Sequence, residues 1–295
     1  MASPPPEKKS LTSLGGLRRE AFVELLGGIY ESSPWVAEGA FLEEEDYYES
    51  ATSLAKAMRA VVSSAPVDRK VELLRAHPDL AGRAKLSTLT AESQSEQKSA
   101  GLDALAPEDL VRFRSLNDAY RSKFGWPFIF AVRNATAQAI LRAFERRVDH
   151  DPDAELRECV AHVHRIAWTR LLDVVHWAPT GFLTSHVLDT ANGIPARGMR
   201  VELTLPSGDT RNFLTNDDGR LDAGAAIRGA DFQPGAYEWH FHVGEYFAAL
   251  DTAATLPPTP FLDVVPLRFG VDNPELHYHV PLLCSPWSFS TYRGS

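Results

Sequence analysis

The chain has 295 residues, of which 44% are hydrophobic and 23% are charged, as in ordinary globular proteins. This length favours two domains, because single cores stop growing at about 250–300 residues. The net charge of −9 argues against nucleic acid or an anionic membrane surface as a partner, and no stretch approaches the length of a membrane span.

The first part of the chain predicts a disordered leader followed by an all-α domain. Residues 1–12 begin with a polar, proline-rich run that has no secretory signal. Residues 13–178 place apolar side chains at spacings of three and four. The expected helices span residues 17–28, 47–62, 67–76, 92–102, 107–124, 135–148 and 154–175. Asp151 before Pro152 is a helix start signal for the last of them.

Residues 179–295 predict a β-sandwich. Apolar and polar residues alternate over 201–205, 237–243, 264–269 and 277–284, and Gly and Pro punctuate the intervals. The segment 223–228 is too short to assign. Charge usage changes at the same boundary, since 23 Lys and Arg residues lie up to Pro179 and only 7, all arginine, follow it. The fold class is therefore α + β and multidomain, with a helical bundle first and a sandwich second.

Several residues of the helical half have two interpretations. His77 precedes Pro78 and so ends a helix, and Ser93 with Glu96 fits a capping box. Arg170 falls on the apolar stripe of the last helix, where an inward guanidinium requires a carboxylate or a bound anion unless it snorkels to the surface.

The cysteines, Cys159 and Cys284, lie in apolar segments and are expected to be buried free thiols.

Four motifs give residues 17–175 a resemblance to the OHCU decarboxylases, which act on 2-oxo-4-hydroxy-4-carboxy-5-ureidoimidazoline. They are His-Pro-Asp-Leu at 77–80, the Ser-Gln-Ser-Glu-Gln run at 93–102, residues 116–129, and Ile-Ala-Trp-Thr-Arg-Leu at 166–171. Trp126 replaces the more usual phenylalanine. The resemblance implies the site residues His77, Pro78, Ser93, Glu96, Gln97, Phe128, Ile129 and Arg170.

The same resemblance implies a decarboxylation without a cofactor, because the imidazoline ring of the substrate can delocalise the carbanion. Arg170 would bind an anionic group of the ring. His77 and Glu96 would handle protons, in an order that the sequence leaves open.

The β half contains two His-x-His pairs, and each pair points to one face of a strand. His240 and His242 are more simply solvated or structural residues. A metal held by the pairs, His277 and His279 included, is a further possibility, but no suitably spaced carboxylates support it.

Residues 180–295 resemble the transthyretin-like 5-hydroxyisourate hydrolases through motifs at 184–196, 215–220, 277–283 and 290–295. Transthyretin, a carrier, shares the fold but lacks the two histidines, the arginine and the Tyr-Arg-Gly-Ser ending. The resemblance implies a site formed by His186, Arg220, His279, Ser290, Tyr292, Arg293, Gly294 and Ser295. Histidine would accept the proton of a water, and arginine would stabilise the developing negative charge. Cys284 and Trp287 depart mildly from the family pattern.

The product of the hydrolase is the substrate of the decarboxylase, so the two resemblances together imply a bifunctional enzyme that degrades urate and makes (S)-allantoin. They also imply a homotetramer or higher oligomer through the sandwich and dimer contacts through the helical domain. The expected partners are these small-molecule substrates, with no nucleic acid and no membrane. The expected location is cytoplasmic, or peroxisomal in a eukaryote. A ligand carrier or scaffold with one or no active domain, and a metal hydrolase, are the alternatives.

Overall fold

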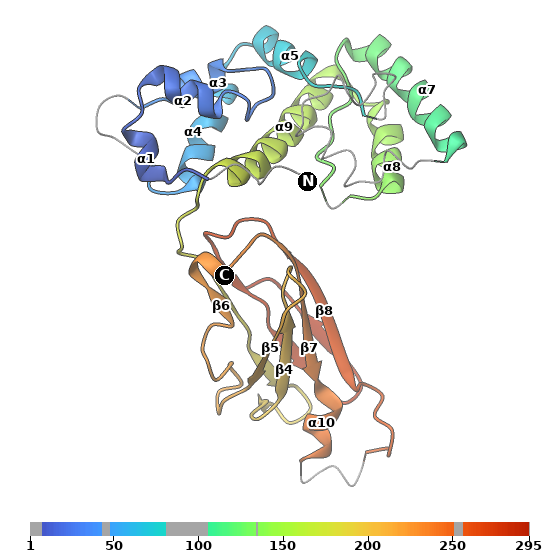
Figure 1. The fold of residues 1–295 in the computed structure, drawn as a ribbon. Coiled ribbons are helices and arrows are strands. Elements are labelled where there is room, and N and C mark those ends of the chain that lie inside the picture. Colours follow the sequence, from blue (N-terminus) through green and yellow to red (C-terminus); the bar gives the residue numbers. More distant parts are fainter. Residues whose placement is uncertain (1–7, 43–47, 81–105, 134, 251–255, 295) are drawn as a thin grey trace, which may run out of the picture. The chain divides into compact units, whose positions relative to one another are not determined.

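The computed structural model describes residues 8–42, 48–80, 106–133, 135–250 and 256–294. The chain divides into two compact units, residues 1–176 and 177–295 (Figure 1). The first unit is helical and the second is a β-sandwich, which confirms the predicted fold class. No helix of the described residues has the length and apolar character needed to cross a bilayer.

The helical unit is arranged around its longest helix. Its helices are α1 (Leu11–Gly15), α2 (Arg19–Leu26), α3 (Trp35–Gly39), α4 (Ala51–Ser64), α5 (Val67–Arg75), α7 (Pro107–Phe124), α8 (Ala137–Arg147) and α9 (Pro152–Val174). The carboxylate of Asp151 caps α9, accepting from the backbone nitrogens of Asp153 and Ala154. Both α4 and α5 pack against α9, and Cys159, Leu171 and Arg170 are among the buried residues of α9.

The described helices differ from the expected ones at a few positions, and local capping explains the start of α4. α4 begins only at Ala51, because Ser50 and Ser53 form a reciprocal capping box there. The expected helix at 92–102 lies outside the described residues. Residues 8–12 of the expected leader are described, with α1 beginning at Leu11 and the backbone nitrogen of Lys9 donating to the carbonyl oxygen of Val174 over 2.9 Å.

The described residues of the β unit form one regular four-stranded sheet and two sheets of shorter strands. Its elements are β1 (Phe182–Thr184), β2 (Val187–Asp189), β3 (Ile194–Pro195), β4 (Arg200–Thr204), β5 (Thr210–Leu214), β6 (Ile227–Arg228), β7 (Gly235–His242), α10 (Val243–Ala248), β8 (Val264–Val271), β9 (His277–His279), β10 (Leu282–Cys284) and β11 (Phe289–Thr291). The sheet orders are β5-β4-β7-β8, β11-β10-β2-β3 and β6-β1-β9. β9 and β10 pair in parallel with β1 and β2 respectively.

Alternation along β7 builds the core of the sandwich. Tyr237, Trp239 and Phe241 are buried, whereas His240 and His242 point to the opposite, partly exposed face. The expected strand at 277–284 is interrupted between β9 and β10, where Pro281 has no backbone N–H to donate. This interruption places β9 and β10 in different sheets.

Candidate active sites

His77 lies directly after the C-terminal end of α5, and only 6% of its surface is exposed. Its Nδ1 is 2.9 Å from the carbonyl oxygen of Leu73. A carbonyl only accepts, so Nδ1 carries a hydrogen and Nε2 is the nitrogen left for a substrate. Burial lowers the pKa of His77, the Leu73 bond and the charge of Glu31 oppose this shift, and the charge of Arg170 adds to it.

Arg170 is buried and has a carboxylate partner, one of the options that the sequence left open. Its Nη1 donates to Oε2 of Glu31 over 2.6 Å, although the two residues are 139 positions apart. Glu31 is itself only 5% exposed and lies between α2 and α3. Glu31 was not predicted from the sequence, because no periodicity or motif marks a residue in this turn. The structure thus brings together His77, Arg170 and Glu31.

The backbone after α7, which includes the predicted substrate contacts Phe128 and Ile129, is fixed by buried polar side chains. Nη1 of Arg147 donates to the carbonyl oxygen of Ile129 over 2.9 Å, and the guanidinium lies 4.5 Å from the ring centroid of Phe128. The backbone nitrogen of Ala131 donates to Nδ1 of His162 over 3.1 Å. Two side chains from α8 and α9 therefore hold this strip of backbone in place.

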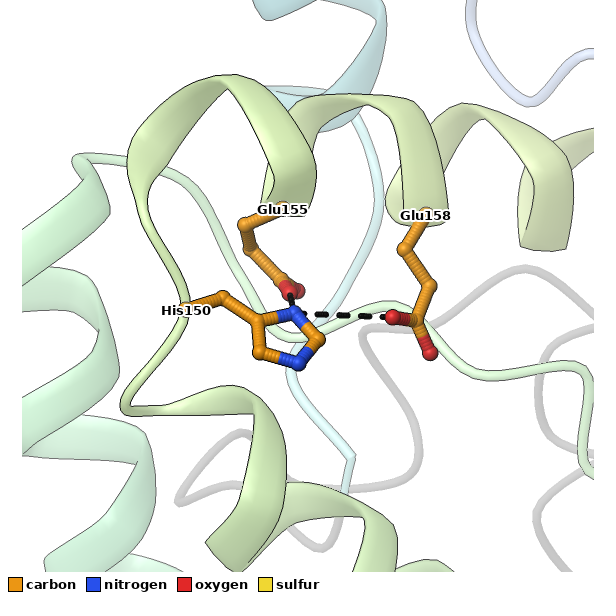
Figure 2. Close-up of side chains that lie close together, drawn as sticks. All are labelled: His150, Glu155 and Glu158. Atoms are coloured by element: carbon orange, nitrogen blue, oxygen red, sulfur yellow. Dashed lines mark hydrogen bonds and ion pairs between the residues drawn. The ribbon is translucent and has the colours of Figure 1, made fainter.

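Arg147, the last residue of α8, pairs with Glu155 near the start of α9. Figure 2 shows how Glu155 lies beside His150 and Glu158. Glu155 is fully buried and accepts from Nη2 of Arg147 over 2.5 Å, and its other oxygen lies 2.9 Å from Nδ1 of His150. The hydroxyl of Tyr120 also donates to Glu155. His150 is 3.5 Å from a carboxylate oxygen of Glu158.

His150, Glu155 and Glu158 are the one group of His and carboxylate residues in the described ranges whose ligand atoms would suit a metal ion. Arginine already balances both carboxylates, through Arg147 on Glu155 and through Arg146 on Glu158 at 2.9 Å. A divalent cation would have to displace these guanidinium groups. We therefore assign the cluster a structural role.

Three of the residues expected in the decarboxylase site lie outside the described residues. They are Ser93, Glu96 and Gln97. Their participation stays a prediction. Pro78 is described, follows His77 directly and is partly exposed.

In the β unit, His186 and Arg220 face each other across an isolated antiparallel bridge. Gly219 allows this close approach. Its φ is +74°, and a Cβ at this position would lie 2.3 Å from the carbonyl oxygen of Val187 and 3.2 Å from Cδ2 of His186. A glycine before Arg220 is therefore needed to bring the arginine beside His186.

His279 is oriented by Thr184. The Thr184 hydroxyl lies 2.9 Å from Nδ1 of His279 and 2.8 Å from Nε2 of His277, whose ring stacks on Phe182 with centroids 4.2 Å apart. Burial lowers the pKa of His279, and the charges of Arg220, His277 and His186 act in the same direction. Thr184 was not predicted as a site residue, although its position opposite His279 in the β1–β9 pair explains the contact.

The last described residues pass over His279. The backbone nitrogen of Gly294 donates to the carbonyl oxygen of His279 over 2.8 Å. A Cβ on Gly294 would lie 2.6 Å from Cδ2 of the imidazole. Arg293 places its guanidinium 4.4 Å from the ring centroid of Tyr278, while Tyr292 is 58% exposed. Ser290 is exposed on β11, and Ser295 lies outside the described residues.

The second histidine pair has the simpler role expected for it. Nε2 of His240 is 2.9 Å from Glu238, and Nε2 of His242 is 3.2 Å from Glu202. Both histidines thus belong to the polar outer face of β7, and neither is part of a metal-competent group of the described residues.

A separate apolar cavity of about 230 Å³ lies beside α10 in the β unit. Phe261 and Trp287 line it, and their rings lie 6.4 Å apart. None of the predicted hydrolase-site residues lines this cavity.

Comparisons with known proteins agree with the two-part geometry. Residues 16–172 match the family model described as OHCU decarboxylase, and residues 183–294 match that of the HIUase/Transthyretin family. The 5-hydroxyisourate hydrolase 2 of Rhizobium meliloti is 50% identical over 120 residues, which are 39% of this chain and 98% of the relative. The 2-oxo-4-hydroxy-4-carboxy-5-ureidoimidazoline decarboxylase of Halalkalicoccus jeotgali is 44% identical over 153 residues, which are 52% of this chain and 84% of the relative.

A solved structure is similar along nearly the whole chain. The crystal structure of an (S)-allantoin synthase matches with 44% identity and a TM-score of 0.81, over 97% of this chain and 100% of that one. Both units, in this order, are therefore present in one known protein. The chain belongs to the OHCU decarboxylase family, and its β unit is a second domain of the HIUase/transthyretin family.

Proposed function

We propose that this chain is a bifunctional enzyme of urate degradation that converts 5-hydroxyisourate to (S)-allantoin in two steps. The β unit opens the ring of 5-hydroxyisourate by hydrolysis, and the helical unit decarboxylates the product. The observation that carries the proposal is the match to an (S)-allantoin synthase along 97% of the chain. The side chains of each unit have the chemistry that its step requires.

His279 is the general base of ring opening. Its lowered pKa keeps the imidazole neutral near pH 7, and the contact of Nδ1 with Thr184 leaves Nε2 for a water. The water oxygen bonds to the ring carbonyl carbon, the ring C–N bond breaks, and the proton taken from water passes to the departing nitrogen. Arg220 stabilises the oxyanion, and His186 beside it positions the substrate.

In the helical unit, the C–C bond to the substrate carboxylate breaks, CO2 leaves, and the imidazoline ring takes up the electron pair. A proton delivered to one face of the carbon then sets the S configuration. Arg170 binds an anionic group of the substrate, and Nε2 of His77 exchanges the proton. Glu96 assists in proton transfer, and no cofactor takes part.

The enzyme assembles through its sandwich into a tetramer or larger oligomer in the cytoplasm, with dimer contacts through the helical unit. Support comes from the sheet edges, because β8 and β11 each have only one neighbouring strand among the described residues. The exposed side chains of Phe289 and Tyr292 lie on or directly after β11. Burial of these aromatics against a second copy would remove them from water.

Circular dichroism and ultraviolet absorbance of one reaction test both steps. The protein is mixed with 5-hydroxyisourate freshly made from urate and urate oxidase. Rapid loss of the substrate absorbance with prompt dichroism of (S)-allantoin is expected. Loss of absorbance alone would leave only the hydrolase. Ligand binding without any turnover would support a carrier, and inactivation by a chelator would point to a metal hydrolase.

A further inference from the structure

Glu31 has an unusual backbone conformation. Its φ is +52°, and it is the one non-glycine residue in the described ranges with a positive φ. L-residues adopt this left-handed region rarely, and such conformations persist where the surroundings hold them. Here the carbonyl oxygen of Glu31 accepts from the backbone nitrogen of Ser33 over 2.9 Å, and the hydroxyl of the preceding Tyr30 lies 2.9 Å from Nδ1 of His164 on α9.

The conformation directs a carboxylate into a buried and charged environment. Glu31, Arg170 and His77 are 5%, 6% and 6% exposed. Among the described residues, the charges that act on His77 are those of Glu31, before α3, and Arg170, on α9. Buried ion pairs add little stability compared with apolar residues of the same volume. A contribution to stability therefore does not explain why Glu31 and Arg170 form a buried pair.

We propose that Glu31 is a positioning residue of the decarboxylase site, which fixes the guanidinium of Arg170 and balances its charge beside His77. This inference rests on the proposed function of the helical unit. Nη1 of Arg170 donates to Glu31 over 2.6 Å. Because the guanidinium is planar, this hydrogen bond also fixes the directions of its other N–H groups. A substrate carboxylate then meets an oriented arginine.

The charge of Glu31 also matters for the proton on His77. Arg170 lowers the pKa of His77, and Glu31 raises it. Without the carboxylate, the interaction that raises the pKa of His77 would be lost, and the imidazole would hold a proton less readily. The protonated and neutral forms are both needed if His77 is to exchange a proton during turnover.

The test is Glu31→Gln in the full chain, which keeps the shape of the side chain and removes its charge. The substrate is generated in the cuvette from urate. We expect kcat for (S)-allantoin formation to fall at least about tenfold, with 5-hydroxyisourate consumption unchanged as an internal control. The limb of the pH profile that belongs to His77 should move to lower pH, because the interaction that raises its pKa is lost.

Two further variants separate positioning from folding. Glu24→Gln removes an exposed carboxylate of α2 and should behave as the wild type. Glu31→Asp keeps the charge but shortens the reach to Arg170, so kcat should fall severalfold while the pH limb stays in place. If Glu31→Gln loses its helical dichroism, Glu31→Asp decides the question.

Wild-type kcat and pH profile in a folded Glu31→Gln variant would refute the inference and leave the proposed function intact. The same holds for a Glu31→Asp variant with unchanged kcat and KM. A wild-type chain that fails to accelerate decarboxylation would instead refute the proposed function of the helical unit.

Discussion

At the scale of single residues, two glycines allow the backbone to approach the histidines of the proposed hydrolase site closely. Gly219 permits the bridge between His186 and Arg220, and Gly294 lets the chain cross the ring of His279. Neither position has room for a methyl group. Steric crowding therefore explains why the third residue of the Tyr-Arg-Gly-Ser ending, Gly294, is a glycine.

Replacement of Gly294 by alanine should impair ring opening specifically. The added Cβ would lie 2.6 Å from Cδ2 of His279, so the imidazole or the tail must shift. We expect kcat/KM for 5-hydroxyisourate to fall about tenfold to a hundredfold, because misplacements near 1 Å have effects of this size. Decarboxylation should not change. Gly270→Ala is the matched control, since nothing lies within 4 Å of a Cβ there, and equal losses in both variants would contradict the steric argument.

The pH dependence of ring opening should report the neighbours of His279. Burial and Arg220 lower the pKa of this histidine, so the acid limb of kcat/KM should lie below the ordinary histidine value of about 6.5. Arg220→Gln removes one of the lowering charges and should move the limb to higher pH, in addition to slowing the reaction. Steady-state rates between pH 4 and 8 measure both effects. If the acid limb of Arg220→Gln stays at the wild-type pH, the group that titrates is not His279.

At the scale of secondary-structure elements, the sequence predicts those elements whose ends are set by neighbouring residues. The expected helix at 107–124 coincides with α7, because Pro107 begins it and Gly125, with φ +76°, ends it. The expected strand at 277–284 spans two strands of different sheets, since pairing partners are not visible in an alternating pattern. Glu31 and Thr184 escaped prediction because their partners are distant in the sequence.

Removal of one partner from the buried ion pair between Glu155 of α9 and Arg147 should destabilise the helical unit strongly, because it leaves a buried charge without its counter-ion. Glu155→Gln leaves the fully buried Arg147 without its carboxylate, and such a loss typically costs about 3–5 kcal/mol. Urea unfolding followed by dichroism at 222 nm measures the effect. Glu158→Gln, almost one turn further along α9 and partly exposed, should cost at most about 1 kcal/mol. Equal costs for the two variants would show that the buried pair has no special role.

At the scale of the whole molecule, the chain consists of two units with separate chemistry. The described residues proposed for the decarboxylase site all come from residues 1–176, and those proposed for the hydrolase site from residues 177–295. Each family assignment came from motifs within one unit. The sequence thus sufficed for the fold class and the family, whereas the contacts that orient the side chains required the structure.

Separate sites predict separable activities. His77→Ala should reduce decarboxylation by at least about a hundredfold and leave ring opening intact, because proton transfer by a positioned side chain contributes about 10²–10⁴-fold. His279→Ala should have the opposite effect. Absorbance follows the first step and dichroism the second. A folded variant that loses both activities would mean that the two units depend on each other for catalysis.

The bond between His77 and the carbonyl of Leu73 has a consequence for the mechanics of α5. The last carbonyls of a helix lack partners within it, and here the imidazole satisfies one of them. The ring that we propose for proton exchange therefore also closes the end of the helix. Fraying of the final turn would release the ring, and a ring that turned during catalysis would expose a carbonyl with no partner. Amide hydrogen exchange at the C-terminal end of α5 should thus slow when the His77 ring is held in place and quicken when the ring is released. Substitutions on the outer face of α5 can therefore alter turnover without contact with a substrate.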